Sequence, residues 1–154
     1  MSSSVRNGEA TRAGALPDWA LLAARVCIVP LFLYSGVGKA LAFSTTAGRL
    51  NGVIDGLGTL LASGAIVVEL GCGTALLIGL FARKAAVALI LFTIAATLMF
   101  HNFWAAPEAQ VTGQTIQFLK NVGLVGALAL VAVLGAGAIS LDAAIGRAAP
   151  KDGA

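Results

Sequence analysis

Four long apolar segments make up most of this chain, and they restrict which folds are open to it. They are residues 19–43, 57–81, 85–106 and 115–139. A helix needs about 20 apolar residues to cross a hydrocarbon core about 30 Å thick, and each segment is long enough. The segments are continuous rather than alternating, which favours helices over the strands of a membrane barrel. The sequence therefore predicts an all-α membrane protein, an antiparallel bundle of four transmembrane helices.

The composition points to the lipid bilayer as the first partner of the chain. Of its 154 residues, 58% are hydrophobic and 11% are charged, and the mean hydropathy is +0.93. Soluble domains are about 45–50% apolar and about 25% charged, so lipid must cover part of this apolar surface. The net charge of +3 comes with no basic run that contains interleaved aromatic residues, so we expect no nucleic-acid binding.

Polar segments connect the predicted helices and predict their orientation. We expect outer loops at 44–56 and 107–113 and a short turn at 82–84, which makes the second and third helices antiparallel neighbours. The basic residues on the side of the termini and the short turn are Arg6, Arg12, Arg83, Lys84, Arg147 and Lys151. The opposite loops contain only Arg49, so the positive-inside rule places both termini in the cytoplasm.

The domain boundaries follow from the same pattern. Residues 1–18 are polar and lack apolar periodicity, so we expect a flexible cytoplasmic tail there. The transmembrane domain is expected at 19–143, and a second cytoplasmic tail at 144–154.

Glu69 is a charged residue in the middle of the second apolar segment. An ionised side chain at mid-bilayer costs at least about 2.5–3.5 kcal/mol, so it normally faces the bundle and has a partner. Arg25 and Glu69 are expected roughly 9 Å and 18 Å from the cytoplasmic ends of their helices. Because extended side chains can close that difference, we expect an Arg25–Glu69 ion pair, which either locks two helices together or takes part in function.

A second polar group is expected toward the outer face of the membrane. Its members are Tyr34, Ser35, Lys39, His101, Asn102, Trp104, Lys120 and Asn121. Lysine and histidine can donate hydrogen bonds to a reduced oxygen, and histidine can pass a proton near neutral pH. The group predicts a pocket for a quinone head group or an anion, with His101 and Glu69 as candidate catalytic residues. Alternatively, the lysines extend to the interface and Trp104 is an interfacial anchor.

The residue types exclude several cofactors. One histidine and no CxxCH motif leave no basis for a haem, and no Gly-rich phosphate loop follows a strand, so no nucleotide is expected. His101 lacks suitable carboxylate partners, so no metal site is expected. Cys27 and Cys72 are interpreted as small buried residues, with a disulfide between them as the alternative.

The chain resembles the DoxX family of small bacterial membrane proteins. Five segments carry the resemblance: LFLYSGVGKALAF (31–43), VVELGCGTALLIGLFARKAA (67–86), TLMFHNFW (97–104), FLKNVGLVGALALV (118–131) and GAGAISLDA (135–143). Together they extend over about residues 20–143. The resemblance implies a four-helix bundle in the bacterial inner membrane.

The resemblance also implies a set of polar positions and a redox context. The recurring positions correspond to Ser35, Gly36, Lys39, Glu69, Arg83, His101, Lys120, Asn121, Ser140, Leu141 and Asp142. The family takes its name from a subunit linked to a quinone-dependent thiosulfate oxidoreductase, and other members are associated with membrane oxidoreductase complexes. We do not expect the large extra domain of the thiosulfate-oxidising type in this chain of 154 residues. An Arg83–Asp142 pair is expected to join helix ends at the cytoplasmic face.

Three functions remain open at this stage. The first is a membrane subunit of a quinone- or thiol-linked oxidoreductase, with a non-covalent quinone as its cofactor and other oxidoreductase subunits as partners. Such a chain would be an accessory subunit rather than an enzyme by itself. The second is a non-catalytic scaffold or assembly protein. The third is a small transporter or channel, which would require a homo-oligomer because four helices are few for a carrier.

Overall fold

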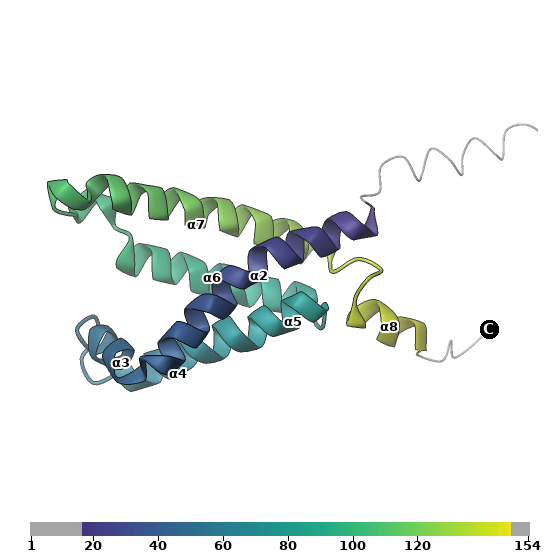
Figure 1. The fold of residues 1–154 in the computed structure, drawn as a ribbon, viewed down its shortest axis with the longest axis horizontal. Coiled ribbons are helices and arrows are strands. Elements are labelled where there is room, and N and C mark those ends of the chain that lie inside the picture. Colours follow the sequence, from purple (N-terminus) through teal and green to yellow (C-terminus); the bar gives the residue numbers. More distant parts are fainter. Residues whose placement is uncertain (1–16, 149–154) are drawn as a thin grey trace, which may run out of the picture.

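The structure, a computed structural model, describes residues 17–148 and shows helices joined by short connections over this range. The helical segments long and apolar enough to cross a membrane are Asp18–Leu41, Gly58–Ile78, Ala82–Ala105 and Glu108–Leu134. The predicted bundle of four membrane helices is therefore confirmed. The start of the first span and the helix after the last span lie at the same end of the bundle, which we call the terminal end (Figure 1). The opposite end is the distal end. The side of the membrane that each end faces stays a prediction.

The second span consists of three successive helical pieces. In chain order the elements are α2 (Asp18–Leu41), α3 (Phe43–Asn51), α4 (Gly58–Ile66), η1 (Val67–Cys72), α5 (Gly73–Ile78), α6 (Ala82–Phe100), η2 (Phe103–Ala105), α7 (Glu108–Leu134) and α8 (Leu141–Ala148). The middle piece of the second span, η1, is a π-helix that contains Glu69. Single π turns inside α-helices are rare and frequently occur at functional sites.

The segment 44–56, predicted as an outer loop, is largely helical. Residues 43–51 form α3 at the distal end, beside the start of α4 (Figure 1). Leu50 is buried, and a Cβ atom at Gly58 would lie 2.1 Å from the carbonyl oxygen of Ala47. One buried leucine and a close contact at a glycine hold this helix in place. Because these two features leave no apolar pattern, the polar sequence did not predict a helix here.

The loop predicted at 107–113 is also mostly helix. The fourth span begins at Glu108, directly after Pro107. An acidic residue in the first turn is favourable beside the free N–H groups of a helix start. The helix therefore starts earlier than its apolar residues alone indicate.

The turn between the second and third spans comprises residues 79–81 rather than 82–84. Gly79 has φ of 71°, a left-handed conformation that glycine adopts readily. The N–H groups of Gly79 and Leu80 donate to the carbonyl oxygens of Leu76 and Ala75, which ends α5 in a Schellman motif. Arg83 therefore belongs to the first turn of α6.

The apolar core occupies the terminal half of the bundle. Its centre contains one fully buried residue from each span: Val29, Leu76, Leu89 and Leu128. Cys72 packs against this core, whereas Cys27 is exposed, and both are free thiols. All four spans contribute buried residues to this core.

Arg25 closes the terminal end of the core and does not contact Glu69. Its side chain is only 1% exposed. Nη1 donates hydrogen bonds to the carbonyl oxygens of Leu76 at 3.3 Å and Leu77 at 2.8 Å, and Nη2 donates to that of Ile139. One guanidinium thus joins the end of α5 to the connection between α7 and α8. The predicted Arg25–Glu69 ion pair is wrong.

The separation along α2 explains this correction. Gly36, which packs against Glu69, is eleven residues beyond Arg25, or roughly 16 Å at 1.5 Å per residue. The prediction treated the ends of the helices as level with one another. In the structure, Arg25 is level with the last turn of α5, so the part of α2 before Arg25 extends beyond that turn.

We expect Arg25→Met to lower the free energy of unfolding by about 2–4 kcal/mol, because three backbone carbonyls lose a charged donor inside the bundle. Thermal or denaturant unfolding of the purified protein in detergent measures this loss. Arg49→Met removes an exposed arginine from α3 and is the matched control, with an expected change within about 0.5 kcal/mol. Equal stability of the two variants would contradict the assignment of Arg25.

Candidate functional site

A cavity of about 670 Å³ lies in the distal half of the bundle. It is bounded by α2, α4, η1, α6 and α7, where the spans diverge (Figure 1). The polar side chains in its wall are Ser35, Lys39, Glu69, Thr93, His101, Lys120 and Asn121. Most of the remaining wall is aliphatic or aromatic, with Leu31, Phe92 and Met99 as examples. We call this space the distal cavity.

An ion pair between Lys39, whose side chain is 28% exposed, and the buried Glu69 forms one side of the distal cavity. Lys39 Nζ lies 2.8 Å from Oε2 and 2.9 Å from Oε1 of Glu69. It also donates a hydrogen bond to Ser35 Oγ at 2.6 Å. Glu69 is 3% exposed, so the ammonium group supplies the partner that a carboxylate needs in this environment.

A glycine allows α2 to approach Glu69. A Cβ atom at Gly36 would lie 2.7 Å from Leu70 Cδ2 and 3.1 Å from Glu69 Cβ. Any larger residue would therefore push α2 away from η1. Lys39 is one turn further along α2 and reaches the carboxylate from there.

Hydrogen bonds between α6 and α7 hold the opposite side of the cavity. Asn121 Nδ2 donates to Thr97 Oγ1 at 2.9 Å, and Thr97 and Thr93 are both buried. His101 Nδ1 lies 2.9 Å from Gln114 Oε1. Two pairs of residues from neighbouring spans thus fix the imidazole and the amide at the cavity wall.

Thr93, Thr97 and Gln114 were not among the predicted site residues. The two threonines are four residues apart, a spacing that places both on one helix face. Each donates its hydroxyl to the carbonyl oxygen four residues earlier, which satisfies the group within the membrane. Two threonines four residues apart within an apolar segment could have indicated a polar helix face. Gln114 carried no such signal, because it lies between the predicted outer loop at 107–113 and the predicted helix at 115–139.

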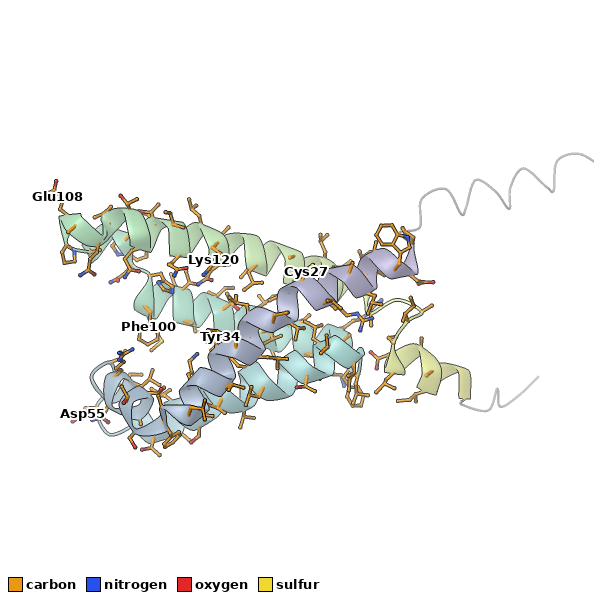
Figure 2. All side chains as sticks on the ribbon, viewed as in Figure 1. Cys27, Tyr34, Asp55, Phe100, Glu108 and Lys120 are labelled. Atoms are coloured by element: carbon orange, nitrogen blue, oxygen red, sulfur yellow. The ribbon has the colours of Figure 1, made fainter. Side chains whose placement is uncertain are left out.

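Lys120 lines the distal cavity, and its side chain is exposed. Within residues 17–148, the structure shows no hydrogen bond or ion pair for this lysine, whereas the charge of Lys39 is balanced by Glu69. Phe100 at the end of α6 and Lys120 on α7 both line the distal cavity, and Figure 2 labels their positions. The cavity therefore favours an electron-rich or anionic oxygen near Lys120.

Three predicted members of the polar group lie outside the cavity wall. Tyr34 is 85% exposed and Trp104 is 60% exposed. Trp104 makes edge-to-face contacts with Phe103 and Phe118, with ring centroids 5.2 Å and 6.0 Å away. Asn102 is also absent from the lining. Tyr34 and Trp104 are exposed where lipid would surround the bundle.

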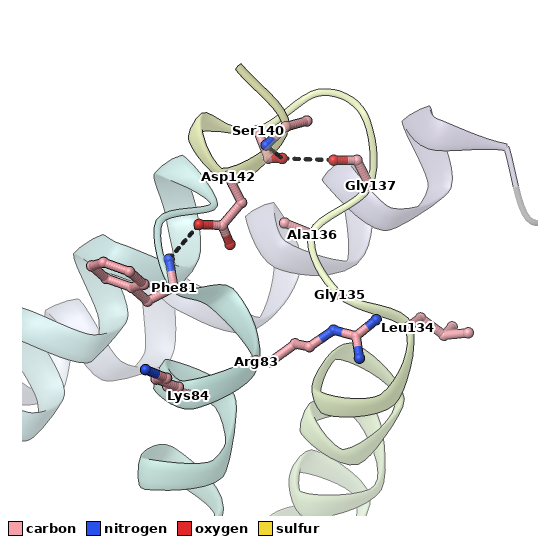
Figure 3. A pocket seen from close by; sticks show the side chains of 10 residues that line it. Phe81, Arg83, Lys84, Leu134, Gly135, Ala136, Gly137, Ser140 and Asp142 are labelled. Atoms are coloured by element: carbon pink, nitrogen blue, oxygen red, sulfur yellow. Dashed lines mark hydrogen bonds between the residues drawn. The ribbon is translucent and has the colours of Figure 1, made fainter. Parts of the chain in front are cut away.

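The predicted Arg83–Asp142 pair is not formed. The carboxylate of Asp142 accepts hydrogen bonds from the backbone N–H groups of Phe81 at 2.8 Å and Ala82 at 3.0 Å. Figure 3 shows Arg83 directed away from this carboxylate, toward Gly135. Asp142 instead caps the start of α6, because the unpaired N–H groups and the positive dipole end of a helix attract a carboxylate.

Comparison with known proteins gives the family. The DoxX family model matches residues 20–102, which is more than half of the chain. The chain belongs to the DoxX family. In this DoxX protein the matched part extends from α2 through α6 and includes the Lys39–Glu69 pair and His101.

Two relatives from Escherichia coli (strain K12) extend the match along the chain. The inner membrane protein YphA is 33% identical over 129 residues, which cover 84% of this chain and 92% of the relative. The inner membrane protein YqjF is 29% identical over 127 residues, which cover 82% and 92%. No solved structure matches this DoxX protein. The relatives and the four spans support an integral membrane protein.

We expect Gly36→Ala to destabilise the protein by about 1–3 kcal/mol, because the new methyl group would overlap the side chain of Leu70. The separation of α2 from η1 should also weaken the Lys39–Glu69 contact. Unfolding in detergent measures the stability. Gly38→Ala is the matched control, since a Cβ atom there meets nothing within 4 Å. A similar loss in both variants would contradict the close approach at Gly36.

The ion pair predicts strong coupling between its two residues. Lys39→Met should lower the free energy of unfolding by about 3–5 kcal/mol, because it leaves the buried carboxylate of Glu69 unpaired. Glu69→Gln should lower it less, because the ammonium group of Lys39 is partly exposed. The double variant should recover most of the loss caused by Lys39→Met. Additive losses in a double-mutant cycle would show that the two side chains do not stabilise one another.

Proposed function

We propose that this protein is an integral membrane subunit of a quinone- or thiol-linked oxidoreductase system and that its distal cavity binds the head group of a quinone. The observation that carries the proposal is the amphipathic character of the cavity. Its volume of about 670 Å³ lies within the range of about 300–1,000 Å³ typical of small-molecule sites. Such sites combine mostly apolar walls with a few convergent polar groups, as this cavity does.

The residues of the cavity fit a quinone. Lys120 has three N–H donors and no partner among the described residues, so it can donate to a carbonyl oxygen. Leu31 and Phe92 offer apolar surface to a ring or an isoprenoid tail. The Lys39–Glu69 pair is already internally balanced, and its proposed role is to hold α2 and η1 in position. The redox association of DoxX-like proteins agrees with this ligand class.

His101 is the proposed proton-handling residue. With Gln114 Oε1 as the acceptor, the proton of this contact lies on His101 Nδ1. In a neutral ring Nε2 is then the free acceptor, and it can take up a proton at the cavity wall. Gln114 would thus orient the imidazole and fix its tautomer. A bound quinone would supply the two-electron, two-proton chemistry that these side chains lack.

A scaffold role is the second candidate. One observation favours it: apart from Lys120, every polar side chain in the wall of the distal cavity has a hydrogen-bond partner within residues 17–148. Such mutual pairing also serves a bundle whose task is to hold other membrane proteins. This role requires no ligand in the cavity.

We expect the wild-type protein, extracted in mild detergent from a bacterial membrane that contains quinone, to retain about one quinone per chain. His101→Ala and Lys120→Met should each weaken retention roughly tenfold, since each removes a hydrogen-bonding group from the head-group site. Organic extraction followed by chromatography and mass spectrometry measures the quinone content.

Tyr34→Ala and Trp104→Ala are the matched controls. Both residues are close in sequence to residues that line the cavity, but neither lines it. They should retain quinone as the wild type does. Background levels of quinone in wild type and variants alike would reject the quinone site and leave the scaffold role.

A further inference from the structure

We propose that the protein has a second binding site, at the terminal end, for the phosphate group of an anionic phospholipid. The site is a pocket of about 440 Å³ between the start of α6, the end of α7 and α8 (Figure 3). The core separates this pocket from the distal cavity, so the inference is independent of the quinone proposal. We call it the terminal pocket.

The charges of the terminal pocket favour an anion. Arg83 and Lys84 line it, and Asp142 is the one carboxylate in its wall. Both oxygens of Asp142 already accept backbone N–H groups at the start of α6. Within residues 17–148, neither Arg83 nor Lys84 has an ion pair. Two cations and one occupied carboxylate leave a positive excess.

The position of the two basic residues strengthens this argument. Both lie in the first turn of α6, where the helix dipole is positive and cations are unfavourable. A phosphate group at this place would interact favourably with the dipole and with both side chains. A bound anion would therefore offset the repulsion between the positive end of the helix dipole and the two basic side chains, which Asp142 offsets only in part.

The connection after α7 keeps Arg83 at the pocket wall. Gly135 has φ of 85°, and a Cβ atom there would lie 3.2 Å from Arg83 Nε. The guanidinium thus packs against a backbone that carries no side chain. Its Nη donors lie beside the pocket and have no acceptor among the described residues.

The apolar rim indicates a lipid rather than a free phosphate. Phe81 and Leu134 border the pocket and are exposed, and Lys84 Nζ lies 5.6 Å from the centroid of the Phe81 ring. On α8, Leu141 and Ile145 are exposed one turn apart. A helix with such an apolar face lies readily at a membrane interface. Acyl chains can contact these residues while the phosphate contacts Arg83 and Lys84.

The test is native mass spectrometry of the full-length protein titrated with phosphatidylglycerol or phosphatidylcholine of identical acyl chains. We expect the first phosphatidylglycerol to bind roughly 25-fold more tightly than phosphatidylcholine, because the attraction of each of the two basic side chains to an anionic lipid contributes about fivefold. Arg83→Ala and Lys84→Ala should each reduce this preference about fivefold. Binding of phosphatidylcholine, whose choline group offsets the charge of its phosphate, should change much less.

Arg49→Ala, which removes an exposed arginine at the distal end, is the matched control and should keep the preference. Equal binding of the two lipids, or an equal loss in Arg49→Ala and Arg83→Ala, would overturn the site. Competition with millimolar inorganic phosphate distinguishes the source of the anion. Displacement of the lipid by phosphate would show a site for the free anion and would overturn the lipid assignment.

Discussion

The interior of a membrane offers no water to a buried charge, and this constraint organises the bundle around Arg25 and Glu69. Both side chains are almost completely buried, and each binds groups from another segment, although Arg25 Nε has no hydrogen-bond partner among the described residues. Arg25 binds carbonyl oxygens at the end of the second span, and Glu69 binds Lys39 of α2. The two contacts lie on either side of the apolar core. They therefore fix the register of α2 against the second span at two separate levels.

The two contacts use different chemistry for reasons that follow from their side chains. A guanidinium has five donors in a planar fork, so Arg25 can bind carbonyls of two chain segments at once. Lysine offers a compact charge on a flexible stem, and Lys39 reaches both oxygens of one carboxylate. The arginine contact satisfies backbone groups where α5 ends, whereas the lysine contact balances a charge beside a cavity. Only the second contact lies where a ligand could meet it.

The sequence predicted the spans well because their length and apolar character follow directly from the thickness of the bilayer. It predicted the polar connections poorly, since α3 depends on one buried leucine, Leu50, and on a close contact at Gly58. The wrong partner for Glu69 arose because apolar length does not reveal how far one helix extends past its neighbour. The π-helix around Glu69 has no sequence signature that we could use.

For the residues of the distal cavity, a similar depth in the membrane was predicted, but the side of the helix on which each residue lies was not considered. Similar depth grouped Lys39, His101 and Lys120, and the structure brings these three to one cavity. Depth also grouped Tyr34 with them, but the face of the helix excludes it. Ser35 and Lys39 are four residues apart and share a face, whereas Tyr34 and Lys39 are five apart and point about 140° away from each other. The rise per residue therefore predicts the depth of a residue in the membrane. The rotation of about 100° per residue is also needed to separate residues that line a cavity from residues that face lipid.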